Sequence, residues 1–195
     1  MNGGRYRVFL FDGDAPTLVD AGLADTTDTL VEQLADLDIM PERLVVTHGD
    51  GDHVGGAPEI ADAYGLETWF PEGLTVDGYT PDHQYGDGDT VGRFTAVHTP
   101  GHAPKHYSLV DEAAGVAVLG DAVFGADARG LPAGYFVLPT GFFSEDLNAA
   151  DESLTALLDY EFDVGLVYHG SSVTKDAREK LRKFVEFNGK PAASR

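Results

Sequence analysis

Residues 48–53 read His48-Gly49-Asp50-Gly51-Asp52-His53. Four potential metal ligands lie within these six residues, and the two glycines give the backbone freedom to fold closely around an ion. Aspartate and glycine are common in turns, so Asp-Gly-Asp alone indicates an acidic turn. The chain has 7 histidines, however, and two of them flank this loop. The stretch therefore predicts a metal site. Calcium is a weak rival, because imidazole is a poor ligand for that hard ion.

Ligand-type residues follow apolar strands elsewhere in the chain as well. Strands are predicted over 44–47, 94–97, 116–119 and 165–168. The first runs into His48, the second into a histidine-rich turn, and the last two into Asp121 and His169. A carboxylate directly after a buried strand is expected to be paired or to bind metal. The repeated layout predicts that these residues serve one site.

Further patterns predict a hairpin and four helices. The hairpin strands cover 7–11 and 17–19, and the helices cover 26–39, 57–64, 146–159 and 173–187. In the first helix, Leu30, Leu34 and Leu37 are predicted to share one buried face. Sheets with helices outside them indicate the α/β class, and 195 residues fit a single domain, 1–195.

Three histidines, His98, His102 and His106, are spaced four apart around a Pro-Gly turn, so they cannot all lie on one helix face. At most two of them can bind the same ion. We select His102, which follows Thr99-Pro100-Gly101, as the ligand and assign His98 and His106 supporting or structural roles. His83 is predicted to be an exposed loop residue.

The composition restricts the chemistry further. There is no cysteine, so a zinc ion has to be held by histidine and carboxylate. The formal net charge of −20 indicates a solvated acidic surface suited to a high-salt cytoplasm, that is, a halophilic protein. The same charge disfavours nucleic acid as a partner. No run approaches the roughly 20 apolar residues that span a bilayer, so no membrane association is predicted. The sequence does not indicate the oligomeric state.

Five motifs, in this order, resemble those of the metallo-β-lactamase superfamily. They are Leu18-Val19-Asp20-Ala21-Gly22, residues 47–56, Thr99-Pro100-Gly101-His102, Leu119-Gly120-Asp121 and Tyr168-His169-Gly170. Five motifs in register over nearly the whole chain are hard to obtain by chance. The resemblance implies an αββα sandwich, in which two mixed β-sheets are flanked by helices and the metal site lies at one edge between the sheets.

The resemblance also implies a set of metal ligands. They are His48, Asp50 and His102 for one ion, and Asp52, His53 and His169 for a second. Asp121 would bridge the two ions, and Asp20 would orient the loop without binding metal. The family's second histidine is Asp50 here, which is a harder and more negative ligand. The implied cofactor is therefore one or two zinc ions, with iron or manganese as alternatives.

The function that the resemblance implies is hydrolysis of a small-molecule ester, thioester or lactone, as in the glyoxalase II-like and lactonase-like members. A metal-bound hydroxide would attack the substrate, with Asp52 and His53 as the catalytic residues and Asp52 steering a proton. Two aromatic stretches, 135–137 and 142–144, are interpreted either as a substrate wall or as ordinary core packing.

Three other functions stay open. A nuclease acting on RNA or single-stranded DNA would use the same metals. The one basic cluster, however, lies on the last predicted helix. It is more simply a solvated face of that helix, with Leu181 and Val185 turned inward. A single iron held by two histidines and one carboxylate would suit a redox or sulfur-oxidising enzyme. The altered loop also fits a degenerate member that binds metal or ligand without turnover.

Overall fold

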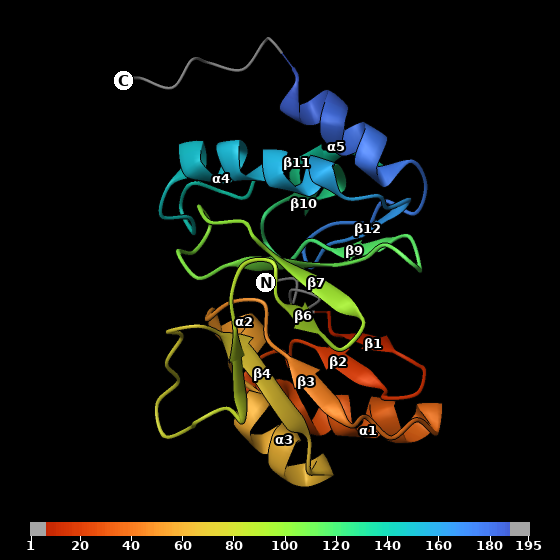
Figure 1. Ribbon diagram of the computed structural model, residues 1–195, viewed down its shortest axis with the longest axis vertical. Coiled ribbons are helices and arrows are strands. Elements are labelled where there is room, and N and C mark those ends of the chain that lie inside the picture. Colours follow the sequence, from red (N-terminus) through yellow and green to blue (C-terminus); the bar gives the residue numbers. More distant parts are fainter. Residues whose placement is uncertain (1–6, 188–195) are drawn as a thin grey trace. The chain divides into compact units, whose positions relative to one another are not determined.

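The computed structural model describes residues 7–187, which fall into two compact units divided between Gly86 and Asp87. We call residues 7–86 the N-terminal unit and residues 87–187 the C-terminal unit. Each unit has a mixed β-sheet, helices and a hydrophobic core of its own (Figure 1). The predicted α/β class is confirmed.

The N-terminal unit contains a five-stranded sheet with the order β1-β2-β3-β4-β5. Its strands are β1 (Phe9–Phe11), β2 (Thr17–Val19), β3 (Arg43–Val45), β4 (Glu67–Pro71) and β5 (His83–Tyr85). The first two form an antiparallel hairpin, and the other neighbours pair in parallel. Parallel neighbours need crossover connections, and α1 (Thr27–Leu37) and α3 (Ala57–Tyr64) provide two of them. Both helices lie on the same face of this sheet (Figure 1).

The first predicted helix is confirmed in place but ends early. After a 3₁₀ turn, η1 (Ala24–Thr26), helix α1 stops at Leu37 because Asp38 adopts a left-handed conformation with φ of 53°. Leu34 is buried in the core, whereas Leu37 is 57% exposed. The prediction was wrong for Leu37, which lines an open cavity of about 510 Å³ beside Leu30.

The C-terminal unit contains a five-stranded sheet with the order β12-β9-β8-β7-β6. Its strands are β6 (Thr90–Val91), β7 (Phe94–His98), β8 (Tyr107–Asp111), β9 (Val116–Val118) and β12 (Val164–Leu166). β12 is parallel to β9, and the other pairs are antiparallel. β10 (Phe124–Gly125) and β11 (Phe136–Val137) form a separate antiparallel pair, and the 3₁₀ turn η2 (Ala126–Arg129) lies between them in the chain.

Two predicted helices of the C-terminal unit differ in extent. The segment 146–159 forms α4 (Leu147–Ser153) and then tightens into a 3₁₀ helix, η3 (Leu154–Asp159). The carboxylate of Asp146 caps α4 by accepting the N–H groups of Asn148 and Ala149. The last helix, α5 (Ala177–Val185), starts later than predicted, because Val173 pairs with Gly165 in a β-bridge instead. Leu181 is fully buried and Val185 packs against the core, as predicted.

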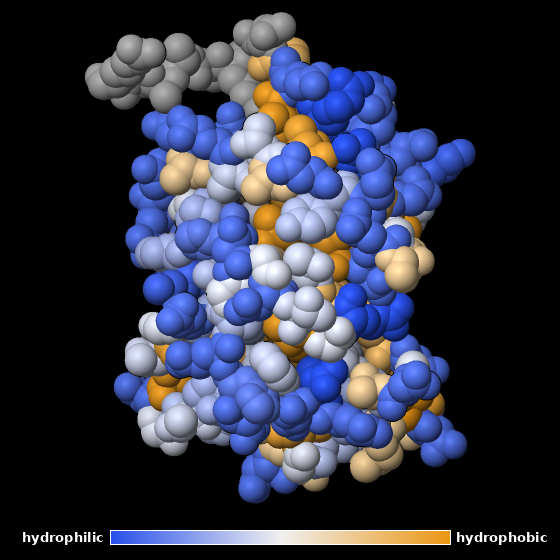
Figure 2. Space-filling view, in the orientation of Figure 1, coloured by the Kyte–Doolittle hydropathy of each residue, from blue (hydrophilic) through white to orange (hydrophobic). Residues whose placement is uncertain are grey.

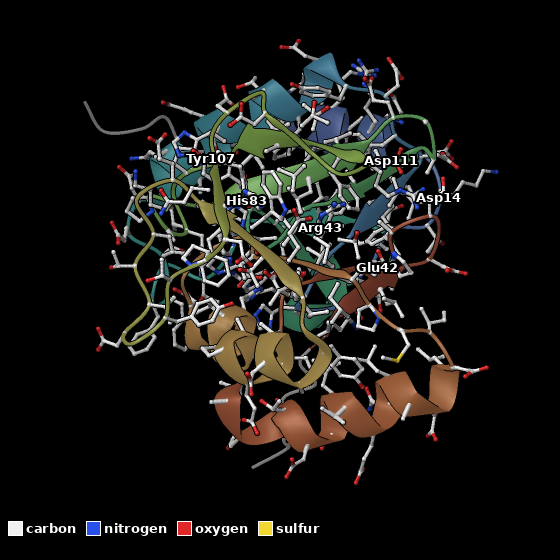
Figure 3. All side chains as sticks on the ribbon, turned by 60° about the horizontal axis from the view of Figure 1, so that its bottom comes forward. Asp14, Glu42, Arg43, His83, Tyr107 and Asp111 are labelled. Atoms are coloured by element: carbon white, nitrogen blue, oxygen red, sulfur yellow. The ribbon has the colours of Figure 1, made fainter. Side chains whose placement is uncertain are left out.

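Charged side chains connect the parallel strands β3, β4 and β5. Glu67 accepts from Arg43 Nε at 3.0 Å and lies 3.0 Å from His83 Nε2. Burial acts to raise the pKa of Glu67, but hydrogen bonds from Arg43, Trp69 and His83 outweigh it and hold that pKa below its usual value. His83 lies in strand β5, not in the predicted loop (Figure 3). Its side chain is 44% exposed.

Hydrophilic side chains predominate on the face of the molecule shown in Figure 2. Among the helices formed by residues 7–187, we find none with the length and apolar character needed to cross a membrane.

Candidate metal centre

In the N-terminal unit, the ligand-type residues lie where β3 leads into a short helix, α2 (Gly51–Val54). The second half of the predicted loop is thus a helical turn, with Asp50 at its N-cap position. His48 and His53 are fully buried, and their ring centroids are 4.0 Å apart. The side chains of Asp50 and Asp52 are 46% and 23% exposed. The unit therefore presents two buried imidazoles beside two carboxylates that solvent reaches.

Asp20 orients His53. It is fully buried in a left-handed conformation, with φ of 62°, at the end of the β2 segment. Its carboxylate accepts the Thr47 N–H at 2.7 Å and the Thr47 hydroxyl at 2.8 Å, and it lies 2.7 Å from His53 Nδ1. A carboxylate only accepts, so Nδ1 of His53 carries the proton and Nε2 carries the lone pair.

Thr47 orients His48 in the same way. The Thr47 hydroxyl gives its proton to Asp20, so its oxygen accepts from His48 Nδ1, which lies 3.0 Å away. Nε2 is then the ring atom of His48 that carries the lone pair. Asp50 Oδ2 lies 3.8 Å from this atom, and Asp52 Oδ2 lies 3.9 Å from Nε2 of His53. Each imidazole is paired with one carboxylate of the motif.

In the C-terminal unit, His102 follows β7 in a loop packed against α4. Gly101 has φ of 132°, and a Cβ there would lie 2.1 Å from the backbone nitrogen of Ala150. His102 Nδ1 lies 3.2 Å from the hydroxyl oxygen of Ser144, which itself donates to the carbonyl of Thr140 at 2.9 Å. Ser144 therefore accepts from Nδ1, and Nε2 of His102 carries the lone pair.

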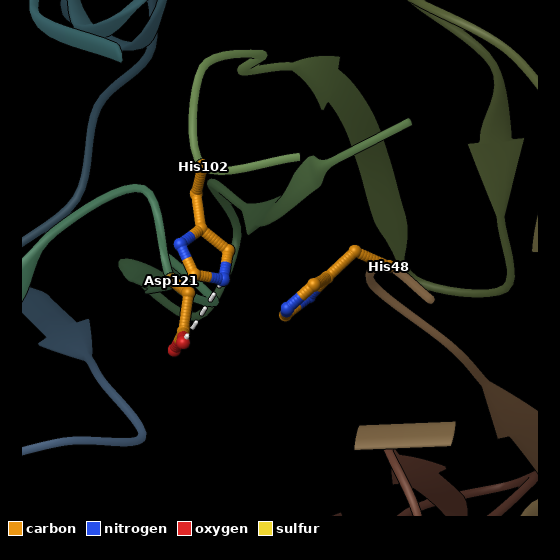
Figure 4. Close-up of side chains that lie close together, drawn as sticks. All are labelled: His48, His102 and Asp121. Carbon is orange, nitrogen blue, oxygen red and sulfur yellow. Dashed lines mark ion pairs between the residues drawn. The ribbon is translucent and has the colours of Figure 1, made fainter. Parts of the chain in front are cut away.

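Asp121 lies three residues after β9 and is buried. Its Oδ2 is 3.5 Å from His102 Nε2, the contact marked by the dashed line in Figure 4, and 3.2 Å from Nε2 of His169. His169 follows β12, and its ring packs against Phe124 with centroids 4.6 Å apart. One carboxylate oxygen thus contacts two imidazoles.

These donors fit a divalent metal ion. Ligand bonds of about 2.0–2.2 Å around a tetrahedral ion separate neighbouring ligand atoms by about 3.3–3.6 Å. The four pair distances, 3.2, 3.5, 3.8 and 3.9 Å, agree with this within a few tenths of an ångström. Donation from Nδ1 to an oxygen acceptor is the arrangement usual for histidines that ligate metal through Nε2.

The remaining histidines make other contacts. His98 Nε2 lies 2.9 Å from the carbonyl of Pro104. His106 uses both ring nitrogens, toward the Thr99 hydroxyl and the Asp121 N–H. These bonds agree with the supporting roles predicted for both residues.

The aromatic stretches divide between two environments. Phe136 is 4% exposed and belongs to the core, whereas Tyr135, Phe142 and Phe143 are 59%, 88% and 67% exposed. Core packing therefore explains Phe136 only.

Two hydroxyl residues at this site, Thr47 and Ser144, were not predicted. Thr47 directly precedes the first histidine of the loop, and this adjacency was a signal that could have identified it. Ser144 is 42 residues from His102 in sequence, so nothing in the local pattern pointed to it.

Comparison with known proteins identifies the family. Residues 3–185 match the metallo-beta-lactamase superfamily. The chain is 28% identical over 130 residues to the hydroxyacylglutathione hydrolase GloC of Haemophilus influenzae. The aligned region covers 55% of this chain and 60% of that protein. It is 28% identical over 194 residues to the lactamase-like protein adaB of Aspergillus niger, covering 94% of this chain and 52% of that protein. The chain thus spans less than two thirds of the length of either relative.

A solved structure shows the same fold. The protein TTHA1623, crystallised in a di-iron-bound form, superposes with a TM-score of 0.72 at 21% identity, over 97% of this chain and 96% of that one. The predicted fold class agrees with this likeness. The match to the family over almost the whole length shows that the chain belongs to the metallo-β-lactamase superfamily.

Proposed function

We propose that this protein is a metal-dependent hydrolase of a small thioester, ester or lactone. The observation that carries the proposal is the buried carboxylate of Asp121, one oxygen of which contacts Nε2 of both His102 and His169. A buried carboxylate between two imidazoles is the donor set of a metal site, and it would be costly without a cation.

The proposed centre has two sets of ligands and one bridging carboxylate. His48 and Asp50 together with His102 would hold one ion, and Asp52 and His53 together with His169 would hold a second. Asp121 would bridge the two ions. The support for this division is the pairing within the N-terminal unit, where Asp50 lies beside His48 and Asp52 beside His53.

A bound divalent ion polarises a carbonyl oxygen and makes water acidic enough to act as a nucleophile. The chain's own residues prepare this chemistry. Asp20 and Thr47 hold two imidazoles in the ligating tautomer, so no reorientation is needed when substrate arrives. The Asp52 carboxylate is 23% exposed and lies beside His53, which suits it to accept a proton from water and pass it to the leaving group.

The substrate class rests on the relatives. GloC is named as a hydrolase of hydroxyacylglutathione, and an acyl group on the thiol of glutathione is a thioester, so a thioester is the first substrate class to test. An ester or a lactone presents a similar acyl carbon to the nucleophile. A phosphodiester is disfavoured by the net charge of −20, which would repel a polyanion.

The metal is proposed to be zinc, with iron and manganese as the alternatives to be tested. Carboxylate is a harder ligand than imidazole, so the first set of ligands is harder with Asp50 than it would be with a histidine at that position. Iron is included because the structurally similar TTHA1623 was crystallised in a di-iron-bound form.

The test combines metal analysis with a substrate panel. The protein is purified without added metal, its zinc, iron and manganese contents are measured, and S-acyl thiols, aryl esters, lactones and a phosphodiester are assayed. We expect about two ions per chain and a metal-dependent thioesterase activity that Asp121→Ala lowers by at least about a hundredfold.

Two variants act as controls. His83→Ala removes an exposed histidine on β5 and is expected to keep the wild-type activity and metal content. Asp50→His is expected to increase the preference for zinc over manganese, because imidazole is the softer ligand. Activity on the phosphodiester alone, a redox reaction with a single iron, or tight metal binding without any turnover would replace the proposed hydrolase with one of those functions.

We also propose that the acidic composition adapts the protein to high salt. A net charge of −20 destabilises a compact chain through self-repulsion, and salt screens that repulsion. The unfolding temperature should therefore rise as potassium chloride is added toward molar concentration. An unfolding temperature that is independent of salt would contradict this adaptation.

A further inference from the structure

His106 is a fully buried histidine that lies outside the proposed ligand set. Its Nε2 accepts the backbone N–H of Asp121 at 2.9 Å. Its Nδ1 lies 2.8 Å from the Thr99 hydroxyl oxygen. The two ring nitrogens therefore connect the turn that carries Asp121 with the loop that leads from Thr99 to His102.

The hydrogen bonds of this network run in one direction. An N–H donates to Nε2, so Nε2 has the lone pair and Nδ1 carries the proton, which it donates to Thr99. The Thr99 hydroxyl then donates to Ser108 Oγ at 3.0 Å, and Ser108 donates to the carbonyl of Leu119 at 3.3 Å. Thr99 and Ser108 are fully buried as well. Each side-chain polar atom of this network therefore donates or accepts a specific hydrogen bond.

The backbone before Asp121 is shaped to the imidazole. Gly120 has φ of 56°, and a Cβ at this position would lie 2.4 Å from Nε2 of His106. Only glycine leaves room for the ring against the turn. The ring contacts the backbone directly beside the residue whose carboxylate contacts His102 and His169.

We propose that His106 is a positioning residue for the metal centre. Its neutral ring fixes the Asp121 backbone relative to the loop that carries His102, because it bonds to the Asp121 N–H and to the Thr99 hydroxyl. This inference rests on the proposed function, because it treats Asp121 as a metal ligand. His106 itself contacts no reacting atom. It sets the place from which the Asp121 carboxylate reaches the two imidazoles.

The test separates the two nitrogens of the ring. In His106→Gln the side-chain amide oxygen occupies the place of Nε2 and still accepts from the Asp121 N–H. In His106→Asn the amide occupies the place of Nδ1 and keeps only the bond to Thr99. Affinity for zinc is measured by competition with a chromophoric chelator, and the ligand geometry is followed by the visible absorption of the cobalt(II)-loaded protein.

We expect His106→Gln to bind zinc within about threefold of the wild type, with an unchanged cobalt spectrum, and His106→Asn to bind at least about tenfold more weakly, with an altered spectrum. Equal metal affinity in both variants, whether normal or weakened, overturns the positioning role. If the wild type itself binds no metal, the proposed function fails first, which is a distinct result.

A second pair of variants covers failure of both His106 variants to fold. Thr99→Ser keeps the hydroxyl that accepts from Nδ1, and Thr99→Val removes it. We predict normal zinc affinity for Thr99→Ser. We predict weakened affinity for Thr99→Val, because without the hydroxyl nothing keeps the proton on Nδ1, and Nε2 can lose the lone pair that accepts from the Asp121 N–H. The amide oxygen of His106→Gln accepts that N–H without needing such a partner. Equal affinities in this pair also overturn the proposal.

Discussion

At the scale of single residues, the candidate centre depends on which nitrogen of each imidazole holds the proton. Nδ1 faces an oxygen acceptor in His48, His53 and His102, and the acceptors belong to Thr47, Asp20 and Ser144. Each bond leaves the lone pair on Nε2 and limits rotation of the ring. The protein therefore prepares its ligands before any ion binds, which lowers the free-energy cost of assembling the site.

Thr47 gives a direct test of this preparation. Thr47→Val keeps the shape of the side chain but removes the hydroxyl between Asp20 and His48. We expect metal affinity to fall about tenfold and the free energy of unfolding of the metal-free protein to fall by about 1–3 kcal/mol, because Asp20 and His48 each lose a buried hydrogen bond. Metal titration and urea denaturation measure the two effects.

The matched control is Thr47→Ser, which keeps the hydroxyl and should bind metal as the wild type does. A valine variant with unchanged metal affinity would show that Thr47 does not orient His48.

At the scale of elements, short strands position the polar residues that follow them, and side chains in the connections secure the strands. The segment between β4 and β5 is an example. The Asp82 carboxylate accepts the Thr68 N–H at 2.9 Å and the Thr68 hydroxyl at 2.8 Å. Hydrogen bonds from the backbone and then from the side chain of Thr68 hold the pKa of Asp82 below its usual value. The ionised carboxylate thus fastens β5 beside β4.

This lowered pKa predicts a pH-dependent contribution to stability. Because the folded pKa is below the unfolded value of about 3.9, the ionised group stabilises the fold above that pH, and the contribution disappears as pH falls through the folded pKa. Asp82→Asn should therefore be less stable than the wild type near neutral pH, by roughly 1 kcal/mol or less for this exposed side chain.

Urea unfolding of the two proteins, followed from about pH 7 to about pH 3, measures this difference. The gap between the wild type and Asp82→Asn should narrow toward the acid end. A gap that stays constant with pH would mean that the ionised form of Asp82 contributes nothing.

At the scale of the whole molecule, folding and metal binding have separate sources of free energy. The described residues contain two hydrophobic clusters, one in each unit, with Leu44 and Phe70 in the first and Leu119 and Leu157 in the second. Burial of such side chains stabilises a fold by about 1.5–3 kcal/mol each, without any ion. A metal that binds only the folded chain adds to this stability.

Removal of metal tests this separation. After treatment with a chelator, the protein should keep its far-ultraviolet circular dichroism but unfold at a lower temperature. The expected loss is about 3 kcal/mol if the free ion was present at a hundred times its dissociation constant, and adding the ion back should restore it. A metal-free protein without secondary structure would contradict the view that the two cores suffice for folding.

The sequence by itself determined the family, the fold class and the candidate ligands. Five motifs in register were enough for the metallo-β-lactamase superfamily, and the match over residues 3–185 confirms it. These features are readable because loop 48–53, Asp121 and His169 each follow a strand within a few residues. Hydrophobic periodicity also located β2 and α3 with the bounds that the structure has. The ligand assignment itself stays a prediction.

The tertiary structure alone decided that Thr47 and Ser144 orient two of those ligands, and where several elements begin and end. Strand β5 has little apolar periodicity, since two of its three residues are exposed, so its pairing with β4 decides its conformation. The bond from His102 to Ser144, for example, spans 42 residues. A hydrogen bond between such distant residues depends on how the chain folds back on itself. The local sequence pattern does not show which distant residues will meet.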